Sequence, residues 1–386
     1  MSRINWQNAY LRLNPEAVLK SLEALFVYHI GRDELYEIDE TAATFLRACD
    51  GTQIGRDLTS EAEFVEFCLE EGILEAKEAP DPIDVYMCQR IEPSLRYLEL
   101  QLTHRCNLRC AHCYLGDNAE APSLSLADAV RITREFAAMG GLRLLISGGE
   151  PLLYGELESY LRQISGLPIR RVLFTNGTLI NAENTKIPDV HEIQFSLDGW
   201  TDSHDRLRGK GAFARTMEGV RIARDFGMPI SFATMIHQYN QHEFDRMAAF
   251  MEDVGAVEWG VDALCRAGSL VRHDDYLVSD EECVPLMAYG FGGGYHGASE
   301  GWACGRHLMT VMPDGRAAKC GFYMDSPVGN AGSGLRKCWE KIGHTRLADL
   351  VECRHCPVVE DCRGGCRFRA SDPLSPDPVM CRLYDI

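Results

Sequence analysis

The chain has 386 residues, of which 46% are hydrophobic and 25% are charged, a composition typical of a globular protein with two or three domains. Its formal net charge of -18 argues against a general nucleic-acid binder and against a protein that binds anionic membranes, because both need a basic surface. The first residues lack a charged segment leading into an apolar run, and no stretch of about 18 apolar residues occurs, so we expect a cytoplasmic protein.

The cysteine content is high for such a protein. There are 16 cysteines, and thiols stay reduced in the cytosol, so a framework of disulfides is not expected there. Metal ligation is therefore the leading interpretation, and the spacing of the cysteines decides which metal.

The first 80 residues are expected to form a separate winged-helix module. Apolar runs at 24–28 and 34–38 flank the turn Gly31-Arg32-Asp33 and predict a hairpin. Amphipathic patterns predict helices at 40–49 and 61–71, followed by a short strand at 73–75. A polar, Pro-rich segment follows at 76–84, and we assign residues 81–94 to a linker.

From residue 95 onward, strand and helix patterns alternate. The predicted strands are 95–103, 142–147, 171–176, 192–197, 229–235 and 257–264, and the predicted helices are 126–139, 157–164, 213–226 and 244–254. This alternation predicts an α/β fold, a partial (β/α)6 TIM-like barrel over 95–290, with its chemistry at the C-terminal ends of the strands. Beyond about residue 295 we expect irregular Gly- and Cys-rich loops ordered by metal, and we assign 291–386 to a Cys-rich iron-sulfur domain.

Cys106, Cys110 and Cys113 directly follow the first predicted strand of the barrel. Three closely spaced thiolates suit a [4Fe-4S] cluster that keeps one iron free of protein ligand, whereas a zinc site normally has four ligands in paired spacing. A zinc site and three unrelated core cysteines remain the alternatives. The spacing, with the aromatic Tyr114 after the last cysteine, resembles the radical S-adenosylmethionine (SAM) superfamily. The resemblance implies that SAM binds the open iron and is cleaved to a 5'-deoxyadenosyl radical.

Polar, Gly-marked segments also end the next three predicted strands. Glycines allow a ligand to approach the backbone, a glutamate accepts hydrogen bonds from an ammonium, and hydroxyl and carboxylate groups bind ribose or an amino acid moiety. Plain β-turns are the alternative for each segment taken alone. The radical SAM resemblance implies that the Gly-Gly-Glu-Pro motif holds the SAM amino group and that an arginine pairs with the SAM carboxylate, although a solvated arginine is an equal alternative. The candidate SAM-binding residues are Tyr114, Gly148, Gly149, Glu150, Pro151, Thr175, Asn176, Ser196, Asp198 and Arg208.

Seven later cysteines keep an order that resembles the SPASM extension of radical SAM enzymes, which carries two auxiliary iron-sulfur clusters. Two structural zinc sites are the alternative. The resemblance implies an inner cluster on Cys304, Cys320 and Cys366, and an outer cluster on Cys353, Cys356, Cys362 and Cys381, giving three clusters of the [4Fe-4S] type with the SAM cluster. The fourth inner ligand stays open among Cys283, Cys338, His296 and an open site. We expect the remaining Cys49, Cys68, Cys88 and Cys265 to be ordinary apolar thiols.

One position disfavours a particular subfamily. The anaerobic sulfatase-maturing enzymes have an aspartate that serves as a base directly after the cysteine equivalent to Cys320, whereas this chain has Gly321 there. Formylglycine formation is therefore not expected.

Residues 10–75 resemble the PqqD-like peptide chaperones of pyrroloquinoline quinone synthesis, which are winged-helix RiPP recognition elements. The resemblance implies that a leader peptide adds a strand to a sheet edge, although a module that only braces the domains is the alternative. We therefore expect a peptide maturase that abstracts hydrogen from a ribosomal precursor peptide and forms a crosslink or an oxidised side chain. Reduced ferredoxin or flavodoxin is the expected electron donor. A radical step on a small molecule, of the haem or pterin-metal type, is the second hypothesis, and a non-catalytic metal-cluster scaffold is the third.

Overall fold

The computed structural model of the chain describes residues 5–88, 91–116, 122–181, 189–292 and 301–386. The candidate ligand His296 lies outside these residues. The chain divides into two compact units. Unit 1 comprises 1–96 with 134–142 and 166–170, and unit 2 comprises the remaining residues. No helix among the described residues combines the length and the apolar character needed to cross a membrane.

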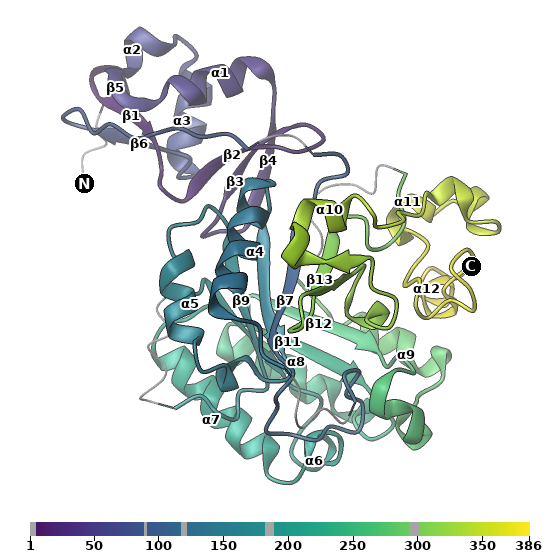
Figure 1. Cartoon of the computed structure of the whole chain (residues 1–386). Coiled ribbons are helices and arrows are strands. Elements are labelled where there is room, and N and C mark those ends of the chain that lie inside the picture. The colour runs from purple at the N-terminus through teal and green to yellow at the C-terminus, as the bar shows by residue number, and fades with distance from the viewer. Residues whose placement is uncertain (1–4, 89–90, 117–121, 182–188, 293–300) are drawn as a thin grey trace. The chain divides into compact units, whose positions relative to one another are not determined.

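Unit 1 contains two small antiparallel sheets (Figure 1). One has the order β5-β1-β6 and the other the order β2-β3-β4. The predicted hairpin is confirmed as β3 and β4, in which Leu25 pairs with Ile38. The elements are β1 (Tyr10–Leu13), β2 (Ala17–Ser21), β3 (Leu25–His29), β4 (Glu34–Ile38), α1 (Glu40–Ala48), β5 (Asp50–Ile54), α2 (Gly55–Leu58), α3 (Ala62–Glu70) and β6 (Leu74–Lys77).

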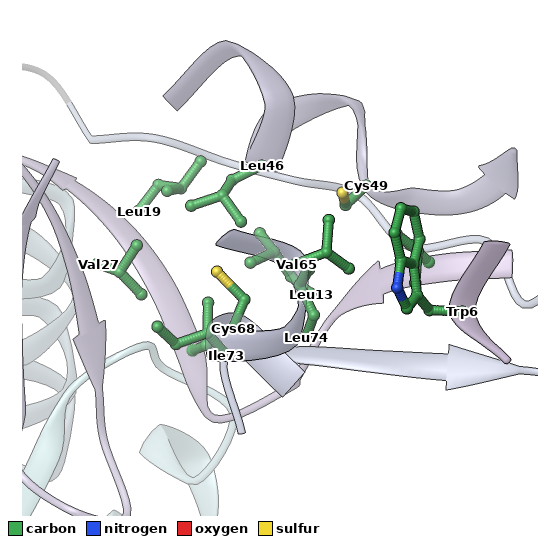
Figure 2. Close-up of a cluster of buried hydrophobic side chains, with 12 residues drawn as sticks. Trp6, Leu13, Leu19, Val27, Leu46, Cys49, Val65, Cys68, Ile73 and Leu74 are labelled. Carbon is green, nitrogen blue, oxygen red and sulfur yellow. The ribbon is translucent and has the colours of Figure 1, made fainter. Parts of the chain in front are cut away.

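The core of unit 1 explains why the two predicted helices form where they do. Each helix turns an apolar face inward, with Leu46 from α1 and Val65 from α3 fully buried (Figure 2). Asp39 caps α1 by accepting a hydrogen bond from the Ala42 amide. Cys49 and Cys68 are also fully buried in this cluster, which confirms that they are packing residues. Burial raises the pKa of the Cys68 thiol to about 12, so that this group stays neutral.

Unit 2 is built on a nine-stranded sheet, in which six parallel strands follow one another in chain order. This arrangement confirms the predicted partial (β/α)6 barrel. The six strands are β7 (Tyr97–Thr103), β8 (Arg143–Gly148), β9 (Arg170–Thr175), β10 (Glu192–Ser196), β11 (Ile230–Ile236) and β12 (Glu258–Ala263). The predicted helices are confirmed as α4 (Leu126–Ala138), α5 (Leu157–Ile164), α7 (Ala212–Asp225) and α8 (Phe244–Val254).

The region after residue 300 has more regular structure than its sequence predicts. Strand β13 (Leu308–Val311) adds to the sheet parallel to β7, and β14 (Arg316–Ala318) and β15 (Gly329–Asn330) continue it. The expectation of irregular loops was therefore wrong for these strands, because two to four residues are too few to display a period of two. The other helices are α6 (Asp202–Arg208), α9 (Asp280–Met287), α10 (Leu335–Trp339), α11 (Val359–Cys362) and α12 (Pro378–Leu383).

Short 3-10 helices lie in the connections of both units. They are η1 (Trp6–Asn8), η2 (Pro151–Leu153), η3 (Gln241–Glu243), η4 (Gly268–Arg272), η5 (Asp274–Tyr276), η6 (Gly321–Tyr323), η7 (Ala331–Ser333), η8 (Leu347–Asp349) and η9 (Cys353–His355).

Candidate functional site

The three cysteines that follow β7 line one cavity of about 200 Å³ at the C-terminal ends of the parallel strands. Strands β8, β9 and β10 end at the same cavity, as a parallel sheet requires. The structure therefore brings most of the predicted SAM-site residues together. The predicted residues that line this cavity are Cys106, Cys110, Cys113, Tyr114, Gly148, Gly149, Thr175, Asn176, Ser196 and Arg208.

Two glycines at the end of β8 are required by the close approach of the last residue of β7 and the start of the cysteine loop. A Cβ atom at Gly148, where φ is +142°, would lie 2.2 Å from the Thr103 carbonyl oxygen. A Cβ atom at Gly149 would lie 2.5 Å from the Arg105 carbonyl oxygen. The Gly149 amide instead donates to the Thr103 carbonyl over 2.7 Å. Any larger side chain would therefore push the cysteine loop away from the strand ends.

Glu150 and Pro151 do not line the cavity. The Glu150 side chain is fully buried, and its carboxylate accepts hydrogen bonds from the Thr175 hydroxyl (2.9 Å) and the Asn176 amide (2.9 Å). Burial raises the pKa of Glu150 to about 7, although the amides that donate to it act in the opposite direction. Pro151 begins η2 and is buried. Through these two hydrogen bonds, Glu150 holds the end of β9 in place.

Asn176 connects the end of β9 to the cysteine loop. Its side-chain amide donates to Asn107 Oδ1 over 2.9 Å, and its Nδ2 atom is 4.0 Å from the Cys106 sulfur. The amide of Leu108 lies 3.5 Å from the same sulfur. Two N–H groups therefore face the first cysteine, as expected around a sulfur that carries negative charge.

Arg208 lines the cavity, and Asp198 holds it there. Arg208, at the end of α6, forms an ion pair through Nε with the Asp198 carboxylate, which is fully buried. The second Asp198 oxygen accepts a hydrogen bond from the Met235 amide over 2.7 Å. Burial alone would raise the pKa of Asp198, but the Arg208 guanidinium holds it well below the usual range. Asp198 therefore acts on the cavity through Arg208.

The donors around the cavity fit an iron-sulfur cluster. Burial raises the pKa of Cys106, and raises that of Cys110 to about 12, so these thiols need a bound cation to become thiolates. The Nδ1 atom of His112 is buried without a hydrogen-bond partner among the described residues, which fits a site completed by a bound group. Among those same residues, no three His, Cys, Asp or Glu side chains converge on one ion. The thiolates around a cubane bind different irons, so they need not converge.

The later cysteines gather in two further places. Cys353, Cys356, Cys362 and Cys381 line one small cavity together with apolar side chains. Cys304, Cys320 and Cys366 line another, of about 620 Å³, to which Cys362 also contributes. The structure thus brings together the four predicted outer ligands in one cavity and the three predicted inner ligands in another, with Cys362 lining both.

Two candidates for the fourth inner ligand are placed by the structure. Cys283 is buried in α9 and shares a cavity with Cys265. Cys338 is buried in α10, and its sulfur lies 3.2 Å from the position that a Cβ atom would take at Gly329. Neither lines the cavity of the three inner cysteines.

Cys265 was expected to be an ordinary apolar thiol, and the structure places it against an expected cluster ligand. It follows β12, and its thiol lies next to that of Cys366. The proximity of the two thiols lowers the pKa of the Cys366 thiol and raises the pKa of Cys265. Sequence spacing gave no sign of this contact, because the two cysteines are about a hundred residues apart.

Sequence reasoning also missed a polar row on β7. Glu99, Gln101 and Thr103 alternate with the buried Leu98, Leu100 and Leu102, so they lie on the other face of the strand. Glu99 lines the cavity of the first three cysteines. The alternation itself was a signal that could have identified this row before the structure was known.

Comparison with known proteins agrees with this geometry. Residues 100–251 match the family model of the Radical SAM superfamily. AdoMet-dependent heme synthase of Nitratidesulfovibrio vulgaris is 25% identical over 342 residues, which are 74% of this chain and 92% of that protein. PqqA peptide cyclase of Ruegeria pomeroyi is 27% identical over 324 residues, which are 74% of this chain and 87% of that protein.

The fold is also shared with a solved structure over nearly the whole chain. Streptococcus suis SuiB, in its crystal structure bound to the precursor peptide SuiA, aligns with a TM-score of 0.70 and 16% sequence identity. The alignment covers 97% of this chain and all of that chain. At this identity the likeness concerns the fold.

Proposed function

We propose that this chain, an enzyme with a radical SAM domain at residues 100–251 and with SAM and iron-sulfur clusters as cofactors, modifies a ribosomal precursor peptide. The observation that carries the radical chemistry is the cavity shared by three cysteines and the ends of β8, β9 and β10. The proposed product is a crosslink or an oxidised side chain in the peptide.

In this proposal each part of the cavity has a separate role. Cys106, Cys110 and Cys113 hold a cluster that, when bound with SAM, supplies a 5'-deoxyadenosyl radical. Arg208 pairs with the SAM carboxylate, because a guanidinium held in a buried ion pair is already oriented to receive it. The backbone at Gly149, which lies against the start of the cysteine loop, would contact the SAM amino group.

Auxiliary clusters in the later cysteines complete the proposal. Cys304, Cys320 and Cys366 would hold the inner one, and Cys353, Cys356, Cys362 and Cys381 the outer one. Their grouping around separate cavities supports this division. We add Cys265 to the candidates for the fourth inner ligand because its thiol lies next to that of Cys366. Residues 291–386 would then form the auxiliary-cluster domain.

The peptide-binding role is proposed for residues 1–80 on the basis of an edge strand and an exposed aromatic side chain. Among the described residues, β4 is the last strand in the order β2-β3-β4, so its outer side is available for a further strand. Phe67 on α3 is 43% exposed and contacts the Tyr36 ring on β4, with ring centroids 6.0 Å apart. A leader peptide would add to β4 and place an apolar side chain against Phe67. SuiB, which shares this fold, is bound to a precursor peptide in its crystal structure.

A small-molecule substrate of the haem type is the second candidate. The similarity to AdoMet-dependent heme synthase extends over 92% of that protein. Basic side chains, including Lys319 and Arg367, line the cavity of the inner cysteines and would suit the carboxylates of a porphyrin precursor.

Anaerobic reconstitution tests the proposal and separates the two candidates. The reduced protein would be incubated with SAM and either a synthetic precursor peptide encoded beside its gene or iron-coproporphyrin. We expect about twelve irons per chain, formation of 5'-deoxyadenosine, and a mass change in the peptide alone. A mass change in the porphyrin alone would favour the second candidate. Stoichiometric zinc without 5'-deoxyadenosine would overturn the radical chemistry as a whole.

A further inference from the structure

Glu99 is a carboxylate held in the cavity of the first three cysteines by side chains from four segments. Its Oε1 atom accepts hydrogen bonds from Ser147 on β8 (2.8 Å), from Tyr114 in the cysteine loop (3.1 Å) and from Gln101 on β7 (3.2 Å). Its Oε2 atom accepts one from Thr310 on β13 (2.7 Å). All four partners donate, so the carboxylate acts only as an acceptor.

The two carboxylate oxygens of Glu99 differ in how many further hydrogen bonds they can accept. A carboxylate oxygen has about two lone-pair sites, and Oε1 is already shared among three donors. Among the described residues, Oε2 accepts a hydrogen bond from Thr310 alone and retains capacity for another. Oε2 is therefore the oxygen that can accept a further hydrogen bond.

Oε2 faces the backbone of Gly321, the residue after the expected cluster ligand Cys320. A Cβ atom at Gly321 would lie 3.2 Å from Oε2 and 3.1 Å from the Tyr114 ring. The next residue, Phe322, lies against the same ring, with centroids 5.7 Å apart, and it lines the cavity of the inner cysteines. Glu99 thus lines the cavity of Cys106, Cys110 and Cys113. It also lies next to the segment that carries Cys320, an expected ligand of the inner cluster.

We propose that Glu99 is the proton acceptor for the peptide substrate, with Oε2 as the accepting atom. This inference rests on the proposed function. Abstraction of a hydrogen atom breaks a C–H bond and leaves one unpaired electron on the substrate carbon. A crosslink or an oxidised side chain then requires loss of one more electron and one proton. The proton would go to Glu99, and an oxidised iron-sulfur cluster, which Cys304, Cys320 and Cys366 would hold, would accept the electron.

A purely structural role for Glu99 is the competing explanation, because the same four bonds join β7, β8 and β13. The variant Glu99→Gln separates the two, since it keeps the size of the side chain and removes the basic oxygen pair. General-base catalysis contributes about 100-fold or more. We expect the yield of modified peptide per 5'-deoxyadenosine to fall by about that factor. If product and 5'-deoxyadenosine fell together, or if neither changed, the proposed role would be wrong.

A second variant places the carboxylate at position 321, opposite Glu99 Oε2. Because a Cβ atom at Gly321 would lie 3.2 Å from Oε2, the double variant Glu99→Gln/Gly321→Asp puts a new carboxylate beside the lost one. We expect it to recover at least about a tenth of the lost yield per 5'-deoxyadenosine. The matched control Glu99→Gln/Gly321→Asn has the same shape without the charge and should recover none. Equal yields from the two double variants would also contradict the proposal.

The assay uses the reconstituted full chain with the synthetic precursor peptide encoded beside its gene, and iron content is measured for every variant. If the wild-type protein modifies no peptide, the proposed function fails. If the wild type modifies the peptide and Glu99→Gln matches its yield per 5'-deoxyadenosine, only the role of Glu99 fails.

Discussion

The ion pair between Asp198 and Arg208 gives the sharpest test of how the SAM cavity is held. In Asp198→Asn, one side-chain oxygen still accepts from the Met235 amide, while the new NH2 group faces Arg208 Nε. Two hydrogen-bond donors then face each other, and the Arg208 guanidinium, which is 11% exposed, loses its counter-charge. Removing one partner of a buried ion pair lowers the free energy of unfolding by about 3 kcal/mol. At about 2–4 °C per kcal/mol, the unfolding midpoint should fall by about 6–12 °C.

SAM binding and pH dependence extend this test. Asp198→Asn should also weaken SAM binding to the reconstituted protein, measured by isothermal titration calorimetry, because Arg208 is no longer fixed. The pKa of Asp198 in the folded chain is below its unfolded value of about 4, so its stabilising effect is complete above that value and is lost only at lower pH. The difference in midpoint should therefore be constant from about pH 5 to pH 9.

The control is Asp202→Asn, which removes the same charge from an exposed position in the first turn of α6. The resulting loss in the free energy of unfolding should stay within about 1 kcal/mol, the usual contribution of a charge at a helix end. If Asp198→Asn matched this control in midpoint and in SAM affinity, the assignment of Asp198 as the residue that positions Arg208 would be refuted.

Three further perturbations test other parts of the molecule. Cys265→Ser should change the electron paramagnetic resonance spectrum of one reduced cluster, since its thiol touches an expected ligand. Phe67→Ser should weaken leader-peptide binding by about tenfold or more, because burying an aromatic side chain contributes about 1.5–3 kcal/mol. Lys20 is buried, and burial lowers its pKa to about 8. The unfolded chain therefore binds more protons between about pH 8 and 10.5, so wild-type stability relative to Lys20→Met should rise by about 2 kcal/mol from pH 8 to pH 10 in urea unfolding.

Each of these perturbations has a matched control. Cys283→Ser changes a buried cysteine in the cavity shared with Cys265, and identical spectra for the two variants would count against Cys265 as a ligand. Phe226→Ser changes a phenylalanine that is 54% exposed at the end of α7, and it should leave leader affinity unchanged. Equal losses in the two phenylalanine variants would rule out a specific site. A pH-independent difference for Lys20→Met would show that Lys20 keeps its ordinary pKa.

The elements of the barrel were predictable because their signals are local. All six parallel strands and four of their helices were expected near their observed bounds, since each has a run of apolar residues with its own period. Several short elements were missed, among them α6, which carries Arg208, and β13, which carries Thr310. Such segments are too short to show a period, and their conformation depends on partners elsewhere in the chain.

The sequence by itself determined the six-strand order and the position of three cysteines directly after the first strand, because both depend on neighbours along the chain. Only the tertiary structure decided that Asp198 would face Arg208, that Cys265 would touch Cys366, and that Glu99 would be held by Thr310, 211 residues away. The physical reason is that parallel strands align their ends at one edge of the sheet, and residues from distant segments meet there without any pattern along the chain.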